Sequence, residues 1–208
     1  MRRIFLFGLI VSMLSISWVP VSFAESDLRQ RVAQAGASPY DQQRTKIRTM
    51  AQKTLSELYA VQPGAQQAIK NAQGYAVFSN FGMKILVAGG GKGAGIAVQN
   101  KTGRETFMKM VELQAGLGIG VKQFRLIWVF DTFTAFDSFV NSGWTLGAQA
   151  TAAAQIKDVG GAYQGAIAVS PGVWLYQLTD NGLALELTAK GTKYYKDKDL
   201  NKGLRQPS

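Results

Sequence analysis

The chain contains no cysteine and no histidine among its 208 residues. Without cysteine it has no disulfide, no thiolate nucleophile and no N-terminal cysteine of the kind that anchors bacterial lipoproteins. Without histidine it lacks the usual general base and the commonest metal ligand of proteins. Catalysis would have to use carboxylates, Lys, Tyr or Ser. These absences disfavour an enzyme, and we expect neither a metal nor a cofactor.

The first 24 residues have the pattern of a secretory signal peptide. Arg2 and Arg3 precede an apolar stretch from Ile4 to Val19, and Ser22-Phe23-Ala24 forms a small-x-small cleavage site. Cleavage is favoured over retention as an anchor, and we expect export to the periplasm or the outer-membrane periphery of a bacterium. The expected organisation is a signal peptide at 1–24, an extension at 25–38, one domain at 39–203 and a tail at 204–208.

The chain is basic, with 23 Lys and Arg residues against 13 Asp and Glu. Removal of Arg2 and Arg3 with the signal peptide leaves 21 basic residues and an excess of +8. In an exported protein this excess favours anionic membrane surfaces over nucleic acid as a partner. The alternative is that the charge only maintains solubility.

A long helix is predicted near the start of the expected domain, from Tyr40 to Ala60. Ser38-Pro39-Tyr40-Asp41 combines a serine N-cap, proline in the first turn and an acidic residue three positions on. Apolar side chains that share one face of this helix are Ile47, Ala51, Leu55, Leu58 and Tyr59. Arg44 and Arg48 lie within or beside that face, whereas Lys46 and Lys53 project elsewhere. The helix either packs on the domain or binds a membrane with these residues.

From Gly74 onward the side-chain pattern alternates with a period of two and predicts strands. A shorter helix is expected before them, at Ala65 to Ala72. The predicted strands are 75–78, 84–88, 95–99, 105–113, 117–121, 125–130, 145–153, 165–169, 173–179 and 184–189. One helix interrupts the series, with Thr134 and Asp137 as a capping box and an apolar stripe from Phe133 to Val140.

The stretch from Met83 to Gly95 begins like a nucleotide-binding loop, with an apolar run followed by a glycine cluster. A dinucleotide site needs a helix after the glycines, but Ile96 to Gln99 continues as a strand into the turn Asn100–Gly103. Glycine at alternate positions instead leaves one face of a strand bare, which permits sharp bending and close approach. We therefore expect no nucleotide.

The expected fold class is α+β. A strongly curved, glycine-rich, mainly antiparallel sheet, partly closed like a barrel, is accompanied by N-terminal helices and one inserted helix. Aromatic residues of the later part of the chain are expected to pack in the core or in cross-strand pairs, the alternative being an aromatic belt at a membrane interface. They are Tyr163, Trp174, Tyr176, Tyr194 and Tyr195.

Several segments in this order and spacing resemble the SYLF domain family, over residues 45–203. They are Gly74-Tyr-Ala-Val-Phe78, the Gly89–Gly95 cluster, Asp131 to Phe139 with Gly143-Trp-Thr-Leu-Gly147, Gly182-Leu-Ala-Leu, Gly191-Thr-Lys-Tyr-Tyr195 and Asn201. The resemblance is to the bacterial, signal-peptide-bearing branch. It implies a lipid-binding domain rather than an enzyme. Eukaryotic members bind phosphoinositides and some bind actin filaments, but an exported bacterial protein is not expected to meet actin.

The leading hypothesis is a non-catalytic envelope protein that binds anionic phospholipid through the first helix and the sheet rim. The candidate lipid-binding residues are Arg44, Lys46, Arg48, Lys53, Ile47, Leu55, Leu58, Lys84, Lys92, Lys190 and Lys193. One alternative is a structural protein that binds partners through its sheet edges or its tyrosine-rich C-terminal segment. A less favoured alternative is a hydrolase of envelope polymers that uses Asp131, Asp137, Asp158 or Glu186. The sequence does not define the oligomeric state.

Overall fold

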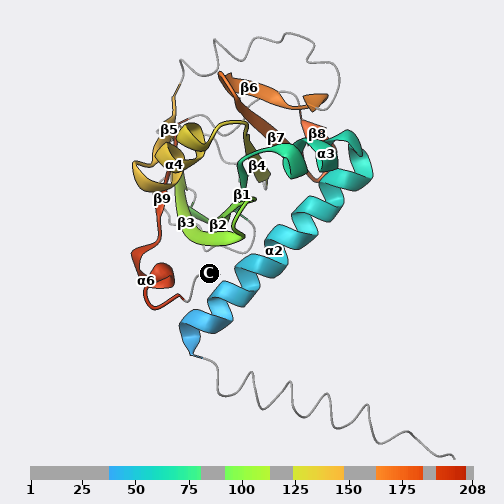
Figure 1. Ribbon diagram of the computed structural model, residues 1–208. Coiled ribbons are helices and arrows are strands. Elements are labelled where there is room, and N and C mark those ends of the chain that lie inside the picture. Colours follow the sequence, from blue (N-terminus) through green and yellow to red (C-terminus); the bar gives the residue numbers. More distant parts are fainter. Residues whose placement is uncertain (1–37, 81–91, 113–123, 148–162, 185–190, 205–208) are drawn as a thin grey trace, which may run out of the picture. The chain divides into compact units, whose positions relative to one another are not determined.

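A computed structural model describes residues 38–80, 92–112, 124–147, 163–184 and 191–204 (Figure 1). These residues belong to one compact unit, Ser38–Ser208. The expected signal peptide and the strands predicted at 84–88 and 117–121 lie outside the described residues. Gly89, Gly90 and Gly91 of the glycine cluster lie outside them as well.

The elements carry the labels of Figure 1. The helices are α2 Pro39–Val61, α3 Gly64–Asn71, α4 Phe133–Asn141 and α6 Lys198–Asn201. The strands are β1 Gly74–Ser79, β2 Lys92–Gln99, β3 Arg104–Glu112, β4 Arg125–Phe130, β5 Trp144–Leu146, β6 Ile167–Ser170, β7 Val173–Thr179, β8 Gly182–Ala184 and β9 Thr192–Lys196.

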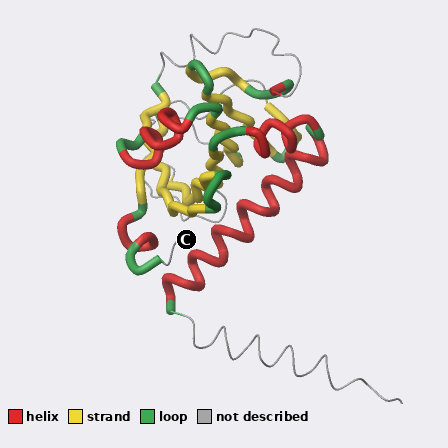
Figure 2. Tube along the Cα trace, in the orientation of Figure 1, coloured by secondary structure: helices red, strands yellow, loops and turns green. Residues whose placement is uncertain are grey.

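The described strands form a nine-stranded sheet in the order β5-β9-β3-β2-β1-β4-β7-β6, with β8 paired to β7. Each strand pairing among the described residues is antiparallel. The sheet curls strongly into a half-barrel, with helices packed on both of its faces (Figure 2). The predicted α+β class and the curved antiparallel sheet are therefore confirmed.

The two faces of the sheet bury separate clusters of apolar side chains, because successive residues of a strand point to opposite sides. The inner face carries Phe78, Trp128 and Phe130, which pack with the aromatic side chains of α4. The outer face carries Val77, Ile96, Phe107 and Ile127, and α2 and α3 cover it. Each residue of a central strand such as β4 is thus directed toward one core or the other, which explains its continuous apolar sequence.

Helix α2 packs along the outer face of the sheet (Figure 1). Its first turn is capped as predicted, since the amide of Asp41 donates to the Ser38 hydroxyl at 3.2 Å. The Ser38 hydroxyl donates in turn to the Asp41 carboxylate at 2.7 Å, and these bonds, together with Arg44, lower the pKa of Asp41. Ile47 and Leu58 are buried beneath the helix, and Leu58 is 0% exposed.

Two glycines of β2 mark a close approach between neighbouring strands. A Cβ atom on Gly95 would lie 2.5 Å from the carbonyl oxygen of Val77 and would overlap the Phe78 ring. A Cβ atom on Gly93 would lie 2.8 Å from the carbonyl oxygen of Ser79.

The chain then runs from β2 through a turn closed by the Gly103 amide, which donates to the Gln99 carbonyl at 2.8 Å. The predicted hairpin is confirmed, and no helix follows the glycines.

The structure corrects the capping prediction for the inserted helix. The N-cap of α4 is Thr132, whose hydroxyl accepts from the Ala135 amide at 3.3 Å. Asp137, which was expected to complete a capping box with Thr134, instead accepts from the Asn141 side chain at 2.7 Å. Two Thr residues two positions apart offer similar local signals, and only the position of the first turn distinguishes them.

Other differences concern short elements near the C-terminus. The sequence did not predict β9 as a strand or α6 as a helix, although β9 alternates in the expected way. The predicted strand at 145–153 appears as the three residues of β5, since Gly147 is not in a strand and 148–153 lie outside the described residues. Short elements contain too few residues for a period to be recognised.

Replacement of Gly95 by alanine is expected to destabilise the domain by about 1–3 kcal/mol, because the added methyl group overlaps backbone and core atoms that have no room to move. Gly147→Ala is the matched control, since a Cβ atom there meets nothing within 4 Å. Urea unfolding of the two variants and the parent measures the difference. Equal stability of Gly95→Ala and the parent would contradict the close approach of β1 and β2.

Replacement of Thr132 by alanine is expected to cost about 1 kcal/mol of unfolding free energy, because it removes the side-chain cap of α4. Thr134→Ala removes the same group two residues away, inside the exposed first turn, and is expected to be nearly neutral. Urea unfolding again distinguishes the two variants. A larger loss at Thr134 would restore the capping assignment made from the sequence.

Candidate functional site

The arginines of α2 that were expected to face lipid make intramolecular contacts. Arg44 donates to the carbonyl oxygens of Leu200 and Lys202, each at 2.8 Å, and its side chain is only 11% exposed. Arg48 forms two hydrogen bonds to Glu105, at 2.8 and 2.6 Å, and its guanidinium carbon lies 5.2 Å from the centre of the Phe107 ring. Both arginines therefore hold α2 against the sheet and α6.

The apolar residues of α2 that were expected to insert into a membrane lie on the same docked face. Ile47 and Leu58 are buried, and Leu55 is half-buried against the outer core. These side chains do not reach a membrane while α2 is docked. The exposed side of the helix is mainly polar, apart from Tyr40 and Val61 near its two ends. Of the candidate cations it carries Lys46 and Lys53. Lys53 is 75% exposed, with its ammonium 4.0 Å from Glu57.

Two candidate lysines come together on the rim of the sheet. Lys92 of β2 pairs directly with Val111 of β3, and Val111 pairs directly with Lys193 of β9. Directly paired residues of antiparallel strands point to the same face, so these three side chains form one row, here called the basic row. Two strand spacings separate the Lys92 and Lys193 backbones, which is about 10 Å. Both lysines are exposed, and half-buried Val111 lies between them.

The basic row lies on the outer face, beyond the part that α2 covers. Lys109 occupies the same face two residues before Val111, but its ammonium is 3.1 Å from buried Asp197, and the pair links β3 to α6. Lys92 and Lys193 have no ion pair or side-chain hydrogen bond within the described residues. Lys84 and Lys190, the other candidates from the sequence, lie outside those residues.

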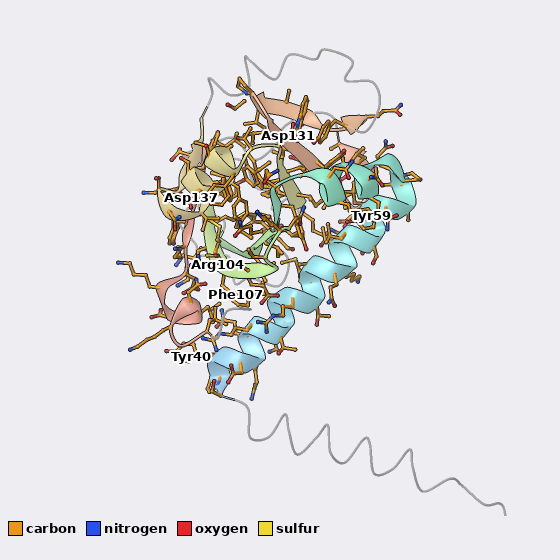
Figure 3. All side chains as sticks on the ribbon, viewed as in Figure 1. Tyr40, Tyr59, Arg104, Phe107, Asp131 and Asp137 are labelled. Atoms are coloured by element: carbon orange, nitrogen blue, oxygen red, sulfur yellow. The ribbon has the colours of Figure 1, made fainter. Side chains whose placement is uncertain are left out.

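The described acidic candidates are each engaged by other side chains. Asp131 accepts from the Tyr163 hydroxyl and from the Trp174 indole at 2.8 Å. The rings of Tyr163 and Trp174 stack with centroids 4.4 Å apart, and burial followed by the bond to Asp131 raises the pKa of Tyr163. Asp137 lies on α4 (Figure 3), where it accepts from the Asn141 side chain at 2.7 Å. Asp158 and Glu186 lie outside the described residues.

The tyrosine-rich C-terminal segment is largely part of the fold. Tyr194 is buried in the inner core, where its ring packs edge-on against Phe78 and Trp128. Tyr176 is fully buried in the outer core. The prediction that these two aromatic residues pack in the core is confirmed.

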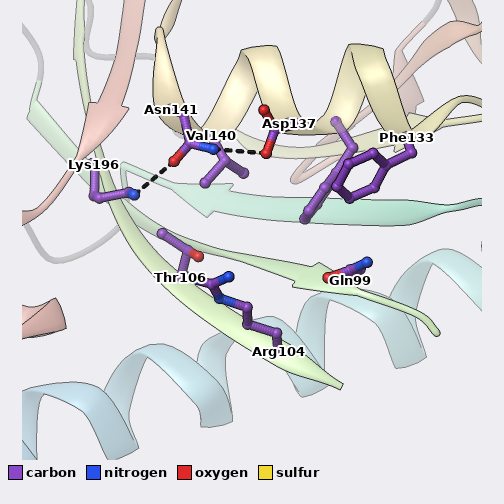
Figure 4. Close-up of a pocket in the computed structure, with 9 residues that line it drawn as sticks. Gln99, Arg104, Thr106, Phe133, Asp137, Val140, Asn141 and Lys196 are labelled. Carbon is purple, nitrogen blue, oxygen red and sulfur yellow. Dashed lines mark hydrogen bonds between the residues drawn. The ribbon is translucent and has the colours of Figure 1, made fainter. Parts of the chain in front are cut away.

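A pocket of about 50 Å³ lies between α4 and the end of the β2–β3 hairpin (Figure 4). Its residues are Gln99, Arg104, Thr106, Phe133, Phe136, Asp137, Val140, Asn141 and Lys196. Sequence reasoning missed the pocket because its basic residues come from strand ends far apart in the chain. The only local signal was the alternation of Thr192, Tyr194 and Lys196, which indicates a strand with Lys196 on the face of Tyr194.

Within the described part of the chain, no helix combines the length and apolar character needed to cross a bilayer.

Comparisons with known proteins match this chain to one family. A family model described as Ysc84, Las17-binding protein actin regulator, matches residues 111–205. Beta cell expansion factor A of Aeromonas veronii is 34% identical over 164 residues, which cover 78% of this chain and 60% of that protein. This chain thus spans about 60% of the length of that curated relative. The resemblance found from sequence motifs is confirmed, and the chain is a member of the Ysc84/SYLF domain family.

Proposed function

We propose that this protein is a non-catalytic lipid-binding protein of the bacterial cell envelope, and that the basic row binds anionic headgroups. The observation that carries the proposal is the direct register of Lys92, Val111 and Lys193 on one exposed face. Two lysines whose backbones lie about 10 Å apart can contact one phosphate together or two neighbouring headgroups with their long side chains. The apolar side chain of Val111 between them suits the boundary between headgroups and acyl chains.

The strength of such binding is limited by the small number of charges. Each lysine near an anionic membrane surface contributes about 1 kcal/mol, and salt screens this attraction within a Debye length of about 8 Å. The basic row alone therefore supports reversible, peripheral association. Lys46 and Lys53 on the exposed side of α2 add to the positive field of the domain.

In this proposal α2 stays docked while the protein binds lipid. The helix is held by Arg44 and Arg48, and by Glu57, whose carboxylate lies 2.6 Å from Arg125 of β4. Exposing the apolar side chains of Ile47 and Leu58 to a membrane would require these contacts to break and would open the outer core. Burial of each aliphatic side chain contributes about 1.5–3 kcal/mol to the stability of the domain. Lipid binding with α2 undocked would have to offset this loss, so we favour binding with α2 docked.

The location and the absence of catalysis belong to the same proposal. Export follows from the expected signal peptide, and an exported protein meets anionic lipid at membrane surfaces. Asp131 is held by Tyr163 and Trp174, and Asp137 by Asn141, so both are explained by structural roles. Actin, which the family description names, is not proposed as a partner.

A second candidate function is binding of a protein partner along the sheet edges. The described sheet ends at β5 and β6, which have three and four residues. Such short edges offer few backbone hydrogen bonds to an added strand, so this function ranks second.

Replacement of Lys92 and Lys193 by glutamine is expected to weaken binding to vesicles of phosphatidylcholine mixed with phosphatidylglycerol. The loss should be about 5-fold for each residue and about 30-fold for both, from about 1 kcal/mol per charge. Vesicle sedimentation at low salt measures the dissociation constant, with phosphatidylcholine alone as the neutral surface. The matched control is Lys101→Gln with Lys198→Gln, which removes two exposed charges elsewhere.

Two outcomes of this experiment contradict the proposal. Equal binding of the parent to neutral and mixed vesicles would remove the electrostatic basis. Equal losses in the two double variants would show that net charge matters and the basic row does not.

Replacement of Glu105 by glutamine tests the docked state of α2. The change weakens the contact with Arg48 and is expected to lower stability by up to about 1 kcal/mol, since this ion pair is partly exposed. Vesicle binding is expected to match that of Asp180→Asn, which makes the same charge change in an exposed turn. Much tighter binding by Glu105→Gln would show that α2 leaves the sheet and that its apolar face contacts lipid.

A further inference from the structure

The pocket of Figure 4 lies at the other end of the strands from the basic row and on the other face of the sheet. Lys92 begins β2 and points to the outer face, whereas Gln99 ends β2 and shares the inner face with Ala97. Eight residues of strand span roughly 23 Å. The pocket is therefore placed to bind a second ligand while the basic row contacts a membrane.

Two cationic side chains border the pocket. Arg104 is exposed and, within the described residues, its guanidinium has no ion pair or hydrogen bond. The Lys196 ammonium donates to the Asn141 side chain at 2.8 Å and keeps further N–H groups for another acceptor. Figure 4 shows that these residues come from β3 and β9, below and beside α4. Their charges make the pocket attractive to an oxyanion.

A hydroxyl group lines the same pocket. Thr106 is only 7% exposed as a residue and lies on β3 between Arg104 and the core. Its hydroxyl makes no hydrogen bond within the described residues, so it can donate to an acceptor bound in the pocket.

The one carboxylate of the pocket is already engaged. Asp137 accepts from the Asn141 amide at 2.7 Å, and Asn141 in turn accepts from Lys196 (Figure 4). These two hydrogen bonds orient the Lys196 ammonium at the pocket wall. Because two cations and one carboxylate line the pocket, its net charge is positive.

The volume of the pocket and the side chains at its rim determine what kind of ligand fits. Sites for whole small molecules have volumes of about 300–1,000 Å³, whereas this pocket has about 50 Å³. It has room for one carboxylate group and not for a complete metabolite. At its rim Phe133 is 50% exposed, which is unusual for a large apolar side chain in this domain. An exposed aromatic ring beside cations suits a peptide with an acidic side chain next to an apolar one.

We propose that this pocket is a docking site for an acidic segment of a partner protein, with one Asp or Glu carboxylate bound by Arg104, Lys196 and Thr106. An apolar neighbour of that residue packs on Phe133. The site is independent of the proposed lipid function, because the basic row contributes no residue to it.

The test uses the isotope-labelled protein and two blocked dipeptides, acetyl-Phe-Glu-amide and its neutral match acetyl-Phe-Gln-amide. In an NMR titration the glutamate peptide is expected to shift the backbone amides of Arg104, Thr106 and Asn141 to saturation. The glutamine peptide is expected to bind about tenfold more weakly, because a charge-assisted hydrogen bond is lost.

Two variants are expected to change peptide binding in opposite directions. Arg104→Gln is expected to abolish the discrimination between the two peptides. Asp137→Asn keeps the acceptor for Asn141 and removes the competing negative charge, so the glutamate peptide is expected to bind several-fold more tightly. Lys101→Gln, an exposed cation in the adjacent turn and outside the pocket, is expected to bind as the parent does. Thermal unfolding confirms that each variant is folded.

Three outcomes would overturn the proposal. The first is equal affinity for the two peptides. The second is saturation of the same amides by inorganic phosphate at a lower concentration than the glutamate peptide requires, which indicates a site for a free oxyanion. The third is loss of vesicle binding in Arg104→Gln as large as in the Lys92→Gln, Lys193→Gln variant, which indicates a lipid site.

Discussion

Helix α2 lies against the outer face of the curled sheet, and its contacts determine which surfaces of the domain remain open. Ile47, Ala51 and Leu58 fill the outer core, while Arg44 and Arg48 tie the helix to α6 and to Glu105. A sheet with apolar residues on both faces must be covered on both, and α2 supplies most of the outer cover. The helix that was considered both for packing and for membrane binding thus packs on the domain.

The inner face is closed differently, by aromatic side chains and by α4. Trp128, Phe139 and Tyr194 meet at centroid distances of 5.1–5.5 Å, so aromatic rings pack together inside the described part of the half-barrel. Glycines at positions 93 and 95 of β2 leave the space that neighbouring side chains occupy. The two proposed binding surfaces are peripheral, with the basic row at one end of the strands and the pocket at the other.

Local sequence signals predicted elements well where they were long or strongly patterned. The Ser38 cap, the apolar face of α2 and the hairpin at Asn100–Gly103 all appear as expected, because each depends on residues close together in the chain. Strand β9, helix α6 and the Thr132 cap were not predicted, because short elements and neighbouring threonines give weak local signals. The candidate site was predicted in composition only: Lys92 and Lys193 were named, but their common row depends on β3 lying between their strands.

The sequence by itself determined the chemistry available to this protein: no thiol, no imidazole, an excess of positive charge and an alternating glycine pattern that favours a bent sheet over a phosphate loop. Only the tertiary structure decided which charges are open to a ligand. Arg48 and Arg104 are the same residue type, yet one is paired with Glu105 and the other stands at the mouth of a pocket. The reason is physical, since the partner of a charged side chain comes from strand pairing and helix docking across many residues.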